Sequence, residues 1–198
     1  MEGLSLFSKK YMLEHVEIAG AINPELIELC VDALVDTRQN SGRLFIIGVG
    51  GSAGNASHAC NDFRKLCDLE AYAPTDNVSE LTARTNDEGW DTVFSEWLKT
   101  SKLNDTDAVL LLSVGGGNKE KGVSVNLINA VDFACQKGAK ILSIVGRDDG
   151  YAAQKSDICI VVPMINPEMI TPHSESYQSV IWHCIVSHPS LQARGTKW

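Results

Sequence analysis

The sequence predicts an α/β protein in which helices flank a doubly wound sheet of parallel strands. Four short, almost wholly apolar runs carry this prediction, at 43–47, 108–112, 140–145 and 158–162. Strands buried on both faces of a parallel sheet have continuous apolar runs of this kind. Helical stretches such as 123–137 separate the runs. This alternation of strand and helix is typical of a doubly wound sheet.

Two helices are expected before the first strand, within the first 40 residues. The second begins near Asn23 and Pro24, because proline suits a first helical turn, and apolar residues from Leu26 to Val35 follow at helical spacing. A weaker strand near 71–73 brings the number of expected strands to five.

The chain is expected to close with a helix from about His173 to Ser187. Pro189 stops that helix, and a short polar tail follows over 190–198. A length of 198 residues suits one domain. We therefore expect N-terminal helices for oligomer contacts over 1–40, an α/β core over 41–189 and the tail.

Charge and hydropathy restrict the partners that this chain can have. Seventeen Lys and Arg against 25 Asp and Glu give a net charge of −8, which disfavours general attraction to nucleic acid or to an anionic membrane. No apolar run approaches the roughly 20 residues of a membrane span. We expect a cytoplasmic protein that holds any anionic ligand locally.

Two glycine-rich loops each follow a predicted strand and lead into a helix, at 48–53 (GVGGSA) and at 113–118 (SVGGGN). Glycines let backbone N–H groups approach an anion, so phosphate is the expected ligand. Neither loop has the Walker or the dinucleotide pattern, which argues against ATP and NAD. The alternative is that each loop is only a tight turn between strand and helix.

Beyond these patterns, the chain resembles the phosphoheptose isomerase family of sugar-isomerase (SIS) proteins over nearly its whole length. The matching parts are GGS at 50–52 followed by His58 and Asp62, TNDEGWDTVFS at 85–95, GRDDG at 146–150, and His183 on the last helix. The resemblance implies a single SIS domain with a flavodoxin-like sheet of five parallel strands. It also implies a homotetramer with active sites built across subunits.

The same resemblance assigns the acid–base pair of the family to Asp62 and His183. It further implies a divalent metal, usually zinc, held by His58, Asp62, Glu175 and His183, where the family more often has Gln at the position of Glu175. Positions 58 and 62 share one helix face, whereas positions 175 and 183 lie about two turns apart. Without the resemblance, a His–x3–Asp pair on a helix is more often a surface or capping interaction.

Substrate contacts are expected in the two glycine loops, in the 85–95 segment and on the last helix. The candidates are Gly51, Ser52, Asn86, Asp87, Ser113, Gly115, Gly116, Gly117, Asn118, Lys119 and Glu175. The loops and Lys119 would bind phosphate, and Asn86 and Asp87 would bind sugar hydroxyls unless they cap a helix. His173, expected just before the last helix, holds substrate, caps that helix or is simply solvated.

The chain departs from the family pattern at three places. Ser113–Asn118 reads SVGGGN where the family usually has STSGNS, so several hydroxyl donors are missing. Val49 replaces the family's Asn, and Asp62 is one methylene shorter than the family's Glu. These changes predict a divergent subgroup.

The resulting functional hypothesis is an aldose–ketose isomerase. It would convert sedoheptulose 7-phosphate into D-glycero-D-manno-heptose 7-phosphate through an enediol, the first step of ADP- or GDP-heptose biosynthesis. One alternative is an isomerase of another ketose phosphate. The other is a noncatalytic SIS module that binds a phosphosugar or a protein, and such a module has no need of an acid–base pair.

Overall fold

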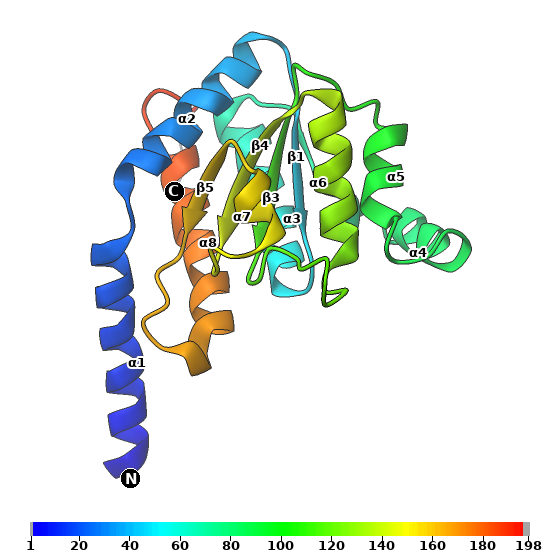
Figure 1. Cartoon of the computed structure of the whole chain (residues 1–198). Helices are drawn as coiled ribbons and strands as arrows, with labels where there is room; N and C mark the ends of the chain where they lie inside the picture. Colours follow the sequence, from blue (N-terminus) through cyan, green and yellow to red (C-terminus); the bar gives the residue numbers. More distant parts are fainter. Residues whose placement is uncertain (1, 196–198) are drawn as a thin grey trace.

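The computed structural model describes residues 2–195 and has three layers, with one sheet between two layers of helices (Figure 1). All strand pairs are parallel and the strand order is β2-β1-β3-β4-β5, the order of flavodoxin-like sheets. The predicted fold class is therefore confirmed. The strands are β1 (Leu44–Gly48), β2 (Ala71–Tyr72), β3 (Ala108–Ser113), β4 (Lys140–Val145) and β5 (Ile158–Val161).

Eight α-helices and two 3₁₀ helices lie within residues 2–195. They are α1 (Glu2–Ala21), α2 (Pro24–Gln39), α3 (Gly51–Cys67), η1 (Pro74–Asp76), α4 (Val78–Asp87), α5 (Val93–Thr100), α6 (Val125–Lys137), α7 (Tyr151–Lys155), η2 (Pro167–Met169) and α8 (Ile170–Val186). The start of α2 agrees with the prediction. Asn23 accepts a hydrogen bond from the backbone N–H of Glu25 at 2.9 Å, and Pro24 occupies the first turn.

The strands are buried on both faces because alternate side chains enter two separate cores. Leu44 and Ile46 of β1 pack with α2, α3 and α8 on one face, and Phe45 and Ile47 pack with α5 and α6 on the other. Every residue of β1 and of β3 is buried. This two-sided burial explains the continuous apolar runs of the sequence.

Helices α4, α5, α6 and α8 differ from the sequence prediction. Helices α4 and α5 were not predicted, and α4 has no buried residue that could produce an apolar pattern. Helix α6 begins at Val125, because Val123 pairs with Asn118 in a short hairpin. Helix α8 begins at Ile170, directly after η2, so His173 lies inside the helix. Of the expected tail, residues 196–198 lie outside the described residues.

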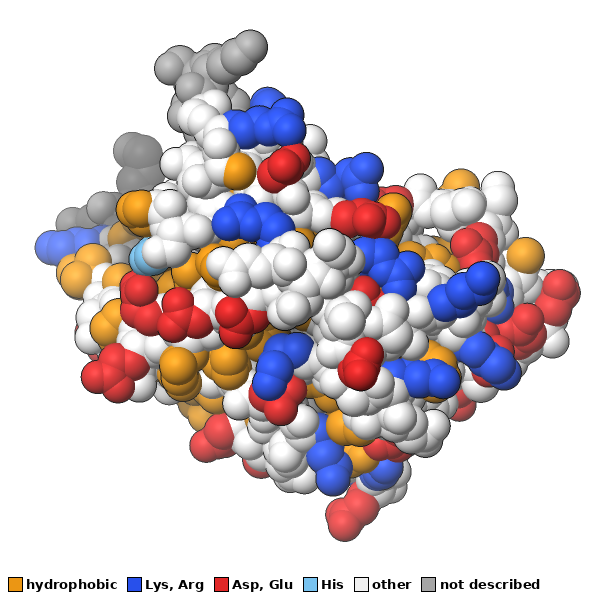
Figure 2. All heavy atoms as spheres, turned by 90° about the horizontal axis from the view of Figure 1, so that it is seen from above, with side chains coloured by type: hydrophobic (Ala, Val, Ile, Leu, Met, Phe, Trp, Pro, Cys, Tyr) orange, Lys and Arg blue, Asp and Glu red, His pale blue; other side chains and the backbone are white. Residues whose placement is uncertain are grey.

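The strands begin at the top of Figure 1 and end at the bottom, where α3 starts. From above, at the face where the strands begin, positive and negative side chains are interspersed (Figure 2). Helix α1 extends toward the bottom of Figure 1, beyond the edge where the strands end. It lies beside the first turns of α8. No helix in the described part of the chain is long and apolar enough to span a membrane.

A buried carboxylate joins the starts of β1 and β3. Asp107 is 1% exposed and accepts hydrogen bonds from the backbone N–H and from Nε and Nη2 of Arg43, at 2.9, 3.1 and 2.7 Å. It also accepts from the backbone N–H of Asn104 at 3.0 Å. The hydrogen bond to Asp107 raises the pKa of Arg43, so the guanidinium stays charged. These contacts fix the register of the two central strands.

We expect Asp107→Ala to lower the free energy of unfolding by about 3 kcal/mol, because it leaves the half-buried Arg43 without its counter-charge. Urea denaturation measures the change. Lys140→Met is the matched control, since it breaks the exposed Lys140–Asp157 pair at 3.8 Å and should cost less than about 1 kcal/mol. Equal effects of the two substitutions would contradict the role assigned to Asp107.

Candidate functional site

The first glycine loop brings the start of α3 against the end of β1. A Cβ at Gly48 would lie 2.4 Å from the backbone oxygen of Ser52, so only glycine fits there. Gly50 has φ +64°, a conformation that glycine adopts without strain. Ser52 follows in the first turn of α3 and is buried. The amino end of α3 therefore lies at the edge of the sheet where the strands end.

Three of the predicted site residues meet on the outer face of α3 and α8. Oδ2 of Asp62 lies 3.7 Å from Nε2 of His58 and 3.8 Å from Nε2 of His183. The other carboxylate oxygen of Asp62 accepts a hydrogen bond from Asn61 at 2.8 Å. The Asp62 side chain is 12% exposed, whereas those of His58 and His183 are 57% and 48% exposed. We call His58, Asp62 and His183 the histidine–aspartate group.

Neighbouring residues fix the orientation of both imidazoles. Nδ1 of His183 lies 2.7 Å from the backbone oxygen of Ser179, one turn earlier in α8. A proton on Nδ1 satisfies that contact and leaves the Nε2 lone pair directed at Asp62. The ring of the fully buried Trp182 stacks on His183 and meets His58 edge-on. The group therefore presents two imidazole nitrogens and one carboxylate oxygen to a common point.

Glu175 is the one expected metal ligand that lies apart from this group. It is on α8, eight residues before His183, which corresponds to about 12 Å along the helix. Its carboxylate lies beside Gly51, because a Cβ at that glycine would fall 2.6 Å from it. Glu175 therefore lies at the edge of the sheet, at the start of α3.

The second glycine loop is closed by its own side chains and by α7. The hydroxyl of Ser113 accepts a hydrogen bond from the N–H of Gly116 at 3.0 Å. The carbonyls of Gly116 and Gly117 accept from the N–H groups of Ala152 and Tyr151, at 2.8 and 2.9 Å. These bonds hold the loop in one conformation.

Lys119 does not line the small cavity of about 180 Å³ beside the second glycine loop, but it lines a neighbouring cavity of about 390 Å³ together with Gly117 and Asn118. Its expected role in binding phosphate stays a prediction. Its Nζ lies 2.9 Å from both Asp132 of α6 and the hydroxyl of Tyr151, and it also lies over the Tyr151 ring. The hydrogen bonds to Tyr151 and Asp132 raise the pKa of Lys119. Sequence reasoning missed this contact because Asp132 and Tyr151 are far away along the chain.

Asn86 and Asp87 lie in the last turn of α4, where their exposed side chains hydrogen-bond to each other. Neither caps a helix, because the amino and carboxyl caps of α4 are Asn77 and Glu88. In a single chain, no contact joins Asn86 or Asp87 to the histidine–aspartate group in the described residues. Their expected role in binding sugar hydroxyls stays a prediction.

His173 attaches α1 to α8 and is buried, so the expectation that it contacts substrate or caps a helix is wrong. Its Nε2 lies 2.8 Å from Glu14, and that hydrogen bond lowers the pKa of Glu14. Tyr11 and His15 of α1 pack against the His173 ring. The sequence carries no signal for this contact, since Glu14 and His173 are 159 residues apart.

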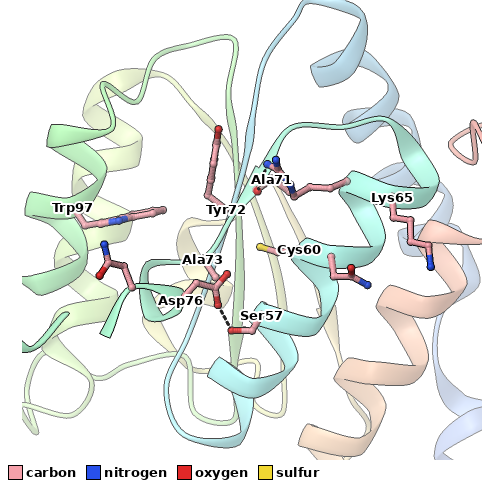
Figure 3. A pocket seen from close by; sticks show the side chains of 11 residues that line it. Ser57, Cys60, Lys65, Ala71, Tyr72, Ala73, Asp76 and Trp97 are labelled. Atoms are coloured by element: carbon pink, nitrogen blue, oxygen red, sulfur yellow. Dashed lines mark hydrogen bonds between the residues drawn. The ribbon is translucent and has the colours of Figure 1, made fainter. Parts of the chain in front are cut away.

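A cavity of about 690 Å³ lies between α3, β2 and α5 (Figure 3). Arg64, Tyr72 and Trp97 are among the residues that line it. A hydrogen bond from Ser57 to Asp76 crosses one end, and the figure draws it as a dashed line. No member of the histidine–aspartate group lines this cavity, so its size alone does not mark the reactive site.

The histidine–aspartate group is equipped for two kinds of chemistry. A carboxylate and an imidazole on one site can move protons between carbon and oxygen atoms of a substrate. Two imidazole nitrogens and a carboxylate oxygen, all within 4.8 Å of one another, can also hold a divalent metal ion. Both uses require the Nε2 atoms to face Asp62, as they do here.

Known proteins are similar to this chain in sequence and in fold. The lincomycin biosynthesis protein LmbN of Streptomyces lincolnensis is 31% identical over 86% of this chain, which spans 64% of the length of LmbN. A phosphoheptose isomerase of Helicobacter pylori strain P12 is 30% identical over 83% of this chain and 84% of that protein. The structure of phosphoheptose isomerase GmhA from Neisseria gonorrhoeae superposes with a TM-score of 0.81 at 24% identity, covering 92% and 97% of the two chains. No family model matches the chain.

We expect Co²⁺, used as a probe ion, to bind one site per chain and to lose affinity at least tenfold in His58→Ala or His183→Ala, since each removes one of three ligands. Calorimetric titration measures this. Glu175→Gln should change the affinity much less, because that carboxylate lies beside Gly51. A loss with Glu175→Gln as large as with the histidine variants would show that Glu175 is a ligand.

Proposed function

Because the chain belongs to the phosphoheptose isomerase family and is therefore an isomerase, we propose that it converts sedoheptulose 7-phosphate into D-glycero-D-manno-heptose 7-phosphate. Family membership supports the substrate, since relatives named phosphoheptose isomerase are about 30% identical over most of their length. The observation that carries the proposal is the convergence of Asp62 with two imidazoles. A noncatalytic binding module does not require that arrangement.

The proposed reaction moves the carbonyl from C2 to C1. A proton leaves C1, an enediol forms, and a proton is added to C2. The oxygen on C1 loses its proton and the oxygen on C2 gains one. In our proposal Asp62 exchanges the carbon-bound proton through Oδ2. His183 moves protons between the substrate oxygens through Nε2, because Nδ1 is directed at the carbonyl of Ser179. The two roles could also be exchanged between these residues.

Zinc is the metal that we propose for the histidine–aspartate group. An Nε2 atom that binds the ion has no lone pair left for a proton, so metal binding and proton transfer by Nε2 of His183 are alternative uses of the group. Activity measured with and without a chelator distinguishes them. Tetrahedral ligands about 2.1 Å from a zinc ion are roughly 3.4 Å from one another, and the measured 3.7 and 3.8 Å are close to that separation. The contact of His183 with Ser179 also orients the ligand, as in known metal sites. A bound ion would polarise the substrate carbonyl and stabilise negative charge on its oxygen.

The distance between the two parts of the site supports a site shared between copies of the chain. Asp62 lies eleven residues into α3, about 16 Å along the axis from Gly51 at the edge of the sheet. An extended seven-carbon sugar phosphate spans roughly 10 Å, at about 1.3 Å of advance per covalent bond. The axial separation of Gly51 and Asp62 therefore exceeds the length of the substrate. We propose that a second copy supplies the acid–base residues.

Exposed apolar residues support the same assembly, which we propose to be a homotetramer. Leu13 and Val16 of α1 are 53% and 67% exposed and lie on one side of that helix. Val180, one turn before His183 on α8, is 55% exposed beside the half-exposed imidazoles. Another copy packed on these surfaces would remove apolar area from water and enclose the histidine–aspartate group. We place the reaction in the cytoplasm.

We expect His183→Gln and Asp62→Asn each to lower turnover of sedoheptulose 7-phosphate at least about 100-fold, because neither amide can transfer the required proton. Substrate affinity should change much less. Incorporation of deuterium at C1 and C2 in heavy water, followed by NMR, measures the reaction directly. Wild-type protein that binds the sugar phosphate but incorporates no deuterium would instead be a binding module.

The assembly is tested by Leu13→Glu/Val16→Glu, which places two charges on the exposed apolar side of α1. We expect this variant to sediment as a smaller species than wild type and to lose activity as it dissociates. Lys99→Glu on α5 changes the net charge by the same amount and should preserve both properties. A dissociated variant with full activity per chain would contradict the shared site.

A further inference from the structure

The two glycine loops offer an anion very different surroundings. At the first loop, the carboxylate of Glu175 already lies beside Gly51, at the start of α3. A phosphate placed there would meet a like charge, which costs free energy in a partly buried position. Glu175 is half-buried, so solvent screens this repulsion only in part. The first loop is therefore poorly suited to the phosphate end of a substrate.

The second loop borders a cavity of about 180 Å³ that two basic side chains line. Lys121 belongs to the hairpin after the loop, and Arg147 follows the neighbouring strand β4. Asp149 also lines the cavity, 3.4 Å from Nε of Arg147, so the lining keeps a net charge of +1. Backbone of Gly115 and Gly117 completes the wall.

The hairpin that carries Lys121 is held by contacts at both ends. Asn118 pairs with Val123 through two backbone hydrogen bonds, of 2.9 and 3.0 Å, and its side chain accepts from the N–H of Lys121 at 2.9 Å. Lys119 is bonded to Asp132 and Tyr151, which lie outside the hairpin. Lys119 thus anchors the hairpin and lines a neighbouring cavity of about 390 Å³, whereas Lys121 lines the cavity of about 180 Å³.

Close packing of glycines brings the two walls of the cavity together. A Cβ at Gly150 would lie 2.2 Å from the carbonyl oxygen of Gly115, and a Cβ at Gly117 would lie 2.8 Å from Ile128. Loops that follow the neighbouring strands β3 and β4 can therefore touch, and Arg147 is brought beside the second glycine loop.

We propose that Lys121 and Arg147 bind the phosphate group of the sugar substrate in this cavity, in place of the hydroxyl donors that the SVGGGN loop lacks. The inference rests on the proposed function for the identity of the sugar phosphate. The binding of an anion by these two side chains does not depend on it. An ammonium and a guanidinium form charge-assisted hydrogen bonds to phosphate oxygens, which are stronger than those of neutral hydroxyls.

Inorganic phosphate is the probe for the first test, with binding measured by calorimetry on the full-length protein. We expect Lys121→Met and Arg147→Met each to weaken phosphate binding about tenfold. Lys140→Met removes the same charge at the opposite edge of the sheet and should bind as wild type does. Glu175→Gln should stay within about twofold of wild type, because phosphate does not occupy the first loop in this proposal.

Steady-state kinetics provide the second test. KM for sedoheptulose 7-phosphate should rise about tenfold in the Lys121 and Arg147 variants, while kcat changes only a few-fold, since these residues bind a part of the substrate remote from the reacting carbons. Wild-type phosphate affinity in both variants, or an affinity that responds to Glu175→Gln alone, would overturn the inference. Phosphate binding with the expected pattern but no isomerisation would leave the cavity assigned and refute the proposed function.

Discussion

The length and direction of α3 are the constraint on which the rest of this structure depends. The helix starts at the edge of the sheet, where Gly48 and Gly50 permit the sharp turn out of β1. It then runs back along the sheet for 17 residues and presents His58 and Asp62 on its outer face. The first glycine loop and Asp62 are consequently about 16 Å apart along the helix axis, more than the roughly 10 Å length of the proposed substrate.

Helix α8, like α3, has one end at the sheet edge and carries an acid–base residue further along its length. Its first turns lie at the sheet edge, where Glu175 meets Gly51 and where a Cβ at Gly146 would collide with Ser174. Its later turns bring His183 to Asp62. The two glycine loops also differ in charge. The carboxylate of Glu175 lies at the first loop, whereas Lys121 and Arg147 line the cavity at the second. Each end of the proposed substrate thus has its own set of partners, and two copies of the chain can bring those sets together.

The sequence was sufficient for the sheet because burial on both faces leaves a direct trace, as in 108–112 and 140–145. It was insufficient for α4, whose side chains are not buried and which therefore has no apolar pattern. His58 and Asp62 could be paired from helical spacing alone. Their meeting with His183 depends on the packing of α3 against α8, and only the family resemblance anticipated it.

Lys119 illustrates the same limit for the second loop. Its position next to SVGGGN predicted a phosphate ligand, and that role stays a prediction. The sequence did not predict that its Nζ would contact Asp132 and Tyr151. Lys121 and Arg147 could have been found from the rule that ligands bind beyond the carboxyl ends of neighbouring strands. The direction of the Lys121 side chain could not, because the hairpin of Asn118 and Val123 sets it.

Complementation between two inactive variants tests the shared site most directly. Asp62→Asn removes the proposed proton acceptor, and Gly116→Asp places a negative charge in the second loop. Co-expressed with different affinity tags and purified as mixed oligomers, the two should recover about a quarter of the wild-type activity, since random pairing gives that share of sites both intact parts. Mixed oligomers no more active than the two variants alone would contradict a site built from two copies of the chain.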